Sequence, residues 1–307
     1  TDNSCLKTHF NYFLIKLIAI NKLKLILLVG LNRPSFVNNL NRVIMSRLNE
    51  KFHQLANKNQ KAFIPFIMAG FPNISYSKNL LNKLPALGAD IIEIGMPFTD
   101  PMADGKIIQD AGHEALEAGF KMNLLFEMIE DFRRTEPNTP IILMGYYNPI
   151  HKFGSENFIK KIKALGVDGL IIVDLPPEED NELCVFCLNH KLHFIRLLTP
   201  TSDNNRLPTL LNNSSGFLYY VSVAGVTGTK VPVKQLVANE INRIKTHTDL
   251  PVCVGFGIKT PEDAKAISTV ADGVVVGSAI IETIQKGATD SDVSAFISSL
   301  SKSIHLE

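Results

Sequence analysis

Eight short apolar segments, separated by longer amphipathic stretches, limit the fold of this 307-residue chain more than any other feature. Segments that are apolar at nearly every position are typical of strands buried on both faces of a parallel sheet. The stretches between them, such as residues 124–132, repeat their apolar residues at helical spacing. The expected strands are residues 62–69, 90–95, 141–146, 169–174, 193–198, 217–222, 252–256 and 273–277.

This alternation predicts a closed barrel, because neighbouring parallel strands must be joined by a crossover, usually a helix. The alternative, a doubly wound open sheet, usually carries a glycine-rich turn after its first strand, whereas residues 69–72 read AGFP. We therefore expect an α/β fold of the (βα)8, or TIM-barrel, class. An extra N-terminal helix is expected before the first strand, with Ser46 as its N-cap.

Residues 1–44 differ from the rest of the chain and are expected to be an extraneous or disordered leader before a single catalytic domain, residues 45–307. A targeting or anchoring role is the alternative, because residues 13–31 are apolar. Lysines at 16, 22 and 24 interrupt this segment, however, and charges at the centre of a membrane span are unfavourable. No small-residue cleavage site follows it.

Composition narrows the class of function. A net charge of +1 with 20% charged residues gives no electrostatic footprint for nucleic acid, and we expect neither a nucleic-acid partner nor a membrane. The four cysteines form no evenly spaced disulfide framework, which favours a reducing cytoplasm. Cys184, Cys187, His190 and His193 are spaced along a helix and into a strand, a path that does not suit a tetrahedral site, so we expect no metal.

One acid interrupts the second apolar segment, and two more follow on the next loop. Glu93 lies near the end of the segment, and the loop carries Asp100 and Asp104. A buried carboxylate is unfavourable unless it is paired, hydrogen-bonded or neutral, and barrel active sites lie at the carboxyl ends of the strands. We expect Glu93 and Asp104 to belong to such a site; a structural ion pair or a helix cap is the alternative.

Glycines cluster after the last three expected strands and suggest a phosphate site. Glycine lets a backbone approach a ligand closely, and the exposed N–H groups at a helix start attract an anion. Barrels often bind phosphate after strands seven and eight. Any one of these glycines could equally be an ordinary turn residue. They are Gly225, Gly228, Gly255, Gly257 and Gly277, the last followed by Ser278.

The run EIGMPFTDPMADG at residues 93–105, followed by Ile107-Ile108-Gln109, resembles the signature of the tryptophan synthase alpha chain. The similarity spans residues 45–303. It implies a carbon–carbon lyase that splits indole-3-glycerol phosphate into indole and glyceraldehyde 3-phosphate by a retro-aldol step. It also implies an alpha2-beta2 assembly in which the beta chain holds pyridoxal phosphate, makes L-tryptophan from the indole, and leaves this chain without a cofactor.

The resemblance also implies roles for single residues. Glu93 would deliver a proton to indole C3, and Asp104 would accept a hydrogen bond from the indole N–H. Thr227 would hydrogen-bond Asp104 when its loop closes. Gly228, Gly257, Gly277 and Ser278 match the phosphate cradle, while Pro97 and Asp100 lie on the loop that faces the beta chain.

For the aromatic and apolar residues at strand ends, substrate binding and core packing are both possible interpretations. Tyr219 matches a tyrosine of the family's pocket, but it could equally fill the barrel. Phe66, Met144 and Phe256 could sandwich the indole ring, although core packing explains each of them equally well.

Two positions depart from the family pattern, and two other functions remain as alternatives. Lys106 stands where the family most often has proline, and Phe71 replaces a more polar residue. A different phosphosugar isomerase or aldolase is disfavoured by the Glu93 and Asp104 pair and by the lack of a mid-strand lysine for a Schiff base. A non-catalytic activator of a beta chain is disfavoured because both acids are present.

Overall fold

The computed structural model describes residues 46–221, 233–255 and 257–305, so the expected leader lies outside the described residues. All eight expected strands are present. The first four are β1 (Ala62–Met68), β2 (Ile92–Gly95), β3 (Ile141–Gly145) and β4 (Gly169–Ile172). The others are β5 (His193–Phe194) with β6 (Arg196–Leu198), then β7 (Leu218–Val221), β8 (Val252–Gly255) and β9 (Gly273–Val276).

The fifth expected strand is divided into β5 and β6, and this division closes the sheet into a barrel. The strand order is β5-β4-β3-β2-β1-β9-β8-β7-β6, with parallel pairing throughout. Ile195 joins the two halves, and its N–H donates to the carbonyl oxygen of Leu170 at 2.9 Å. The first half therefore pairs with β4 and the second with β7. The predicted TIM barrel is confirmed.

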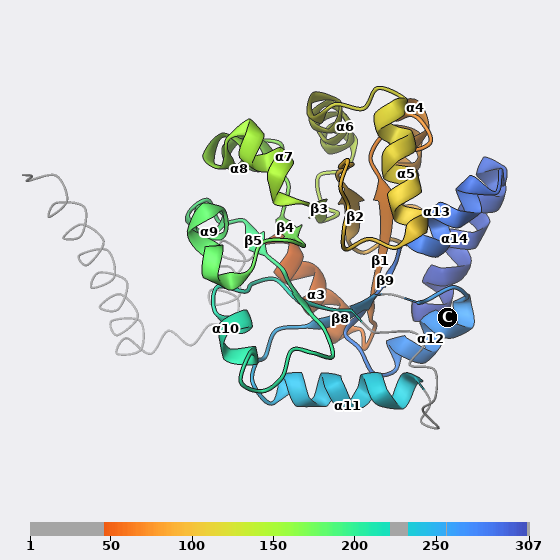
Figure 1. The fold of residues 1–307 in the computed structure, drawn as a ribbon. Helices are drawn as coiled ribbons and strands as arrows, with labels where there is room; N and C mark the ends of the chain where they lie inside the picture. Colours follow the sequence, from red (N-terminus) through yellow and green to blue (C-terminus); the bar gives the residue numbers. More distant parts are fainter. Residues whose placement is uncertain (1–45, 222–232, 256, 306–307) are drawn as a thin grey trace, which may run out of the picture. The chain divides into compact units, whose positions relative to one another are not determined.

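Helices follow the strands and surround them, as Figure 1 shows. The first half of the barrel carries α4 (Ile74–Lys83), α5 (Lys106–Glu117), α6 (Met122–Thr135), α7 (Tyr147–Phe153) and α8 (Ser155–Ala164). The second half carries η1 (Pro177–Glu182), α9 (Cys184–Asn189), α10 (Leu207–Leu211), α11 (Val233–Lys245), α12 (Pro261–Ser268), α13 (Ser278–Gln285) and α14 (Asp290–His305). Among the described residues, no helix has the length and apolar character needed to cross a membrane.

The predicted N-terminal helix is α3 (Arg47–Asn57), and it covers the amino-terminal end of the barrel. Its N-cap is Ser46, as expected, whose hydroxyl accepts from the N–H of Asn49 at 3.1 Å. Leu48 and Leu55 pack into one cluster with inward-facing side chains of the strands. Phe52 adds a ring 5.8 Å from that of Phe217, centroid to centroid. This end of the barrel is therefore filled with apolar side chains.

Alternation along the strands decides which residues face the interior. Ile64, Ile91 and Ile142 belong to the inner cluster, and side chains two residues apart share a face of a strand. Continuing this pattern places Phe66 and Glu93 on the inner face nearer the carboxyl ends. The acid of the second segment therefore lies inside the barrel at the end opposite α3.

Candidate active site

Glu93 is a buried carboxyl group with an open hydrogen-bonding position. It lies on β2, paired in register with Phe66 of β1, and is only 1% exposed. Its Oε2 atom has no hydrogen-bond partner among the described residues. Burial, with a further contribution from the negative charge of Asp104, raises the pKa of Glu93 to about 8. The carboxyl group is therefore protonated at neutral pH and can act as a proton donor.

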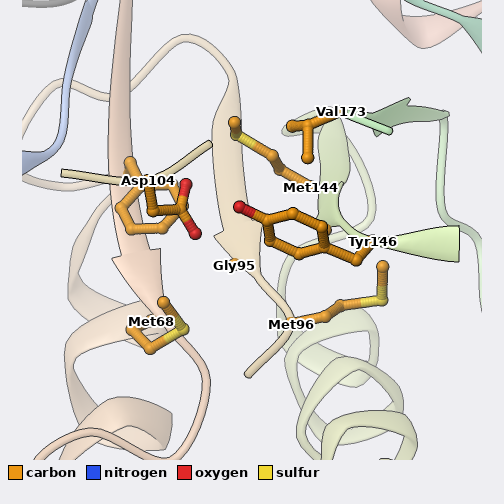
Figure 2. A pocket seen from close by; sticks show the side chains of 9 residues that line it. Met68, Gly95, Met96, Asp104, Met144, Tyr146 and Val173 are labelled. Carbon is orange, nitrogen blue, oxygen red and sulfur yellow. The ribbon is translucent and has the colours of Figure 1, made fainter. Parts of the chain in front are cut away.

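Asp104 is the second acid of the site and has a different ionisation state. It ends the loop that follows β2 and is half-buried. Burial raises its pKa to about 6, although a hydrogen bond from the Tyr146 hydroxyl acts in the opposite direction. Figure 2 shows this hydroxyl pointing toward the Asp104 carboxyl group. Asp104 is thus mostly ionised at pH 7, beside a neutral Glu93.

Tyr146 and Gln109 hold the loop of Asp104 in place, and sequence reasoning assigned a role to neither. The N–H of Ala103 donates to the Tyr146 hydroxyl oxygen at 3.0 Å. The Gln109 side-chain amide donates to the carbonyl oxygens of Asp104, at 2.9 Å, and of Pro101, at 3.2 Å. Tyr146 directly follows β3, so its position at a strand end was the signal that could have found it.

A small cavity lies beside these residues at the carboxyl ends of β1 to β4. Its volume is about 10 Å³. Phe66 packs on Gly95 so closely that a Cβ atom there would lie 2.4 Å from the end of the ring, and only glycine fits. Three residues named from the sequence, Phe66, Asp104 and Met144, therefore meet at one cavity. Among the described residues, its lining is Phe66, Met68, Gly95, Met96, Asp104, Met144, Gly145, Tyr146 and Val173.

Tyr219 lies on β7, buried within the inner cluster and near both acids. Burial raises its pKa well above the ordinary value, and the charges of Glu93 and Asp104 contribute. Its hydroxyl packs on Gly255, where a Cβ atom would lie 2.0 Å away. Tyr219 therefore both fills the barrel and borders the acid pair, so the two sequence interpretations are compatible.

The phosphate candidates are only partly described. Gly257 follows β8, is exposed, and has a φ of +78°, a backbone conformation that favours glycine. Gly277 is the N-cap of α13, and Ser278 is the first residue of this helix. A Cβ atom at Gly277 would lie 3.2 Å from Phe66, which places this helix start beside the cavity. Thr227, Gly228 and Phe256 lie outside the described residues.

The remaining predicted residues lie on the loop after β2, and Lys106 and Phe71 are the two positions that depart from the family pattern. Pro97 is buried and Asp100 is exposed on this loop. Lys106 is the first residue of α5, and its ammonium group pairs with Asp110 rather than with Asp104. Phe71 is buried in the core. In the described part of the chain, no group of three His, Cys, Asp or Glu side chains could hold a metal ion.

Fold and site together define a class of protein: a (βα)8 barrel with two carboxyl groups of unequal pKa at the carboxyl ends of its strands. A family model for the tryptophan synthase alpha chain matches residues 52–303. The chain therefore belongs to the tryptophan synthase alpha chain family. Its function is that of the alpha subunit of tryptophan synthase.

Solved structures agree with the family assignment. Tryptophan synthase subunit alpha from Legionella pneumophila is 36% identical, with a TM-score of 0.79 over 86% of this chain and 100% of that one. Tryptophan synthase from M. tuberculosis, in an open form, is 30% identical, with a TM-score of 0.78 over 86% and 100%. A chain from Aquifex aeolicus is 35% identical, with a TM-score of 0.78 over 85% and 100%.

Proposed function

We propose that Glu93 and Asp104 carry out the retro-aldol cleavage of indole-3-glycerol phosphate, a carbon–carbon lyase reaction. The observation that supports this is the separation of their pKa values, about 8 for Glu93 and about 6 for Asp104. Two neighbouring acids whose environments separate their pKa values are suited to different proton roles in one reaction. At neutral pH the site holds one proton donor and one anion.

In the first step, the Glu93 carboxyl group transfers its proton to indole C3. The positive charge that results is shared with the ring nitrogen, whose N–H donates a hydrogen bond to the Asp104 carboxylate. Because this carboxylate is half-buried and already oriented by Tyr146, it stabilises the developing charge without having to reorganise.

In the second step, the bond between C3 and the glycerol side chain breaks. The Glu93 carboxylate, formed in the first step, accepts the proton of the hydroxyl group on the carbon that leaves. The electrons of the broken bond restore the aromatic indole ring, and the carbon becomes the aldehyde of glyceraldehyde 3-phosphate. Glu93 regains its proton, so the cycle balances. A carboxyl group with a pKa near 8 suits both directions of transfer.

The substrate's phosphate would bind at Gly257, Gly277 and Ser278, with Gly228 completing the site. The exposed start of α13 beside Phe66 supports this placement, since helix N-termini attract anions. The indole ring would then lie against Phe66 and Tyr219, with Phe256 and Thr227 contributing from outside the described residues.

The family implies a beta-chain partner. We further propose an alpha2-beta2 heterotetramer in which the beta chain carries pyridoxal phosphate and uses the indole for L-tryptophan synthesis. By the family resemblance, Pro97 and Asp100 would lie on the loop that faces this partner; Asp100 is exposed there, whereas Pro97 is buried. Cys184, Cys187 and Cys253 are buried free thiols, which supports a cytoplasmic location.

The proposal is tested by measuring indole release from indole-3-glycerol phosphate, with the full chain alone and with a beta chain added. We expect turnover by the chain alone and faster turnover with the beta chain. No release under either condition, from a folded protein, would contradict the lyase. If the chain only stimulated the beta reaction, the activator interpretation would replace it.

Tyr146→Phe will move the acidic limb of the pH profile of kcat/KM to higher pH. Catalysis requires ionised Asp104, and the Tyr146 hydrogen bond holds the pKa of Asp104 below the value that burial alone would give. Losing this bond raises that pKa, so the limb should shift upward by up to about one pH unit. Kinetics between pH 5 and 9 measure this. Tyr147→Phe, which removes a hydroxyl bonded to Ser155 and Glu182 instead, should leave the limb in place.

A further inference from the structure

Three of the seven methionines of the chain gather around the cavity. Met68 of β1, Gly95 of β2 and Met144 of β3 are paired in one register row, so the two methionines flank a residue without a side chain. Met96 follows Gly95, and its side chain lies on Gly145, where a Cβ atom would be 2.8 Å from the methionine methyl group. Figure 2 shows all three around Tyr146 and Asp104.

The cavity is too small for the ring that the site must accept. Its volume of about 10 Å³ accommodates roughly one water molecule. Pockets for small organic ligands are typically at least about 300 Å³. Part of the lining must therefore move before a two-ring aromatic group can enter this cavity beside Phe66.

The methionines are the parts of the lining best able to move. Tyr146 is tied to the loop by the Ala103 N–H, and Phe66 is packed on Gly95. Val173 is branched at Cβ and has little rotational freedom. A methionine side chain has three rotatable bonds and a polarisable sulfur that makes favourable contacts with aromatic rings.

We propose that Met68, Met96 and Met144 form an adaptable wall that retracts to admit the indole ring and determines which rings are accepted. The substrate class is thereby extended to indole-3-glycerol phosphates with a methyl or halogen group on the benzene ring. This inference rests on the proposed function. Because the wall repacks instead of having a fixed shape, an added substituent displaces a methionine end and does not meet a rigid surface.

The test compares the wild type with a variant in which all three methionines become leucine. Leucine is apolar and of similar size, so the core is conserved, but it is branched and reaches less far. The measured quantity is the ratio of kcat/KM for 5-bromo-substituted indole-3-glycerol phosphate to that for the unsubstituted compound. We expect a wild-type ratio within about tenfold of unity. The variant should lower this ratio by about tenfold or more, as expected for steric mismatch in an apolar pocket.

Met128→Leu is the matched control, because Met128 is equally buried but lies on α6 outside the cavity lining. It should leave the ratio unchanged. If the triple variant is unfolded by circular dichroism, the three single variants replace it, and each should lower the ratio in part. A ratio in the folded variants equal to that of the wild type would overturn the proposal.

A second readout separates this proposal from the lyase itself. In protein labelled with ¹³C at the methionine methyl groups, 5-bromoindole should shift the NMR signals of Met68, Met96 and Met144 but not those of Met102 or Met128. Shifts at the three without indole release would contradict the proposed reaction and leave the adaptable wall supported. Unshifted signals at the three would overturn the wall, whatever the activity.

Discussion

Replacing Glu93 by glutamine will lower kcat for indole release by about three orders of magnitude, within the range that general acid–base groups contribute. Glutamine has nearly the same shape, so the barrel interior is conserved, but its amide cannot transfer a proton to C3. The measurement is steady-state indole formation with the beta chain present. Because Glu93 Oε2 has no partner among the described residues, the amide disrupts no hydrogen bond seen there.

Asp110→Asn provides the matched control for this loss. It makes the same acid-to-amide change on α5, at a surface residue paired with Lys106. Its kcat should remain close to that of the wild type. A Glu93→Gln enzyme that retained more than about a tenth of the wild-type kcat would exclude Glu93 as the proton donor and leave the rest of the site to be reassigned.

The same substitution will stabilise the protein at alkaline pH. The pKa of Glu93 is raised from 4.5 to about 8, so between these values the folded protein holds a proton that the unfolded chain releases. The free energy of unfolding of the wild type must therefore fall as pH rises through this interval. Glutamine does not titrate, so the variant lacks this fall. Above pH 8, the free energy of unfolding of the variant should exceed that of the wild type by on the order of 4 kcal/mol, since each unit of pKa shift corresponds to about 1.4 kcal/mol.

Urea unfolding of both proteins at pH 4.5, 7 and 9 tests this prediction. The two curves should nearly coincide at the lowest pH and separate progressively as pH rises. Asp104 also has a raised pKa, but it titrates in both proteins, so its contribution cancels in the difference. An advantage that was constant with pH, or that shrank as pH rose, would show that Glu93 is not the buried neutral acid described here.

Much of the fold was predictable from the sequence, because strands of a parallel barrel are apolar on both faces and stand out as continuous segments. The same contrast marked Glu93, the one acid in the interior of such a segment, whereas Asp90 and Asp174 stand at segment ends. The division of the fifth strand at Ile195 was not predictable, because it depends on which neighbour each half bonds. Tyr146 was missed for a related reason: its partner Ala103 lies on another strand's loop, and only folding brings them together.

The site was predicted less completely than the fold. The structure places Glu93, Asp104, Phe66 and Tyr219 at one end of the barrel, but their roles in the reaction remain predictions. Of the methionine wall, only Met144 was indicated by the sequence; Met68 and Met96 gave no signal, since methionine at a strand end resembles any core residue. Its arrangement depends on the register of β1, β2 and β3, which sets Met68 and Met144 on either side of Gly95.

In the described part of the chain, helix α3 closes the amino-terminal end of the barrel and leaves the carboxyl ends of the strands as its open end. The amino-terminal end is filled by the side chains of Leu48, Leu55 and Phe52. A ligand bound beside Glu93 therefore enters and leaves at the carboxyl ends of the strands. In the proposed reaction, the substrate, the phosphorylated aldehyde and the indole would all pass the carboxyl ends of the strands. Entry and release must therefore follow one another, and a partner bound over this open end would control both which molecules enter and where the indole is released.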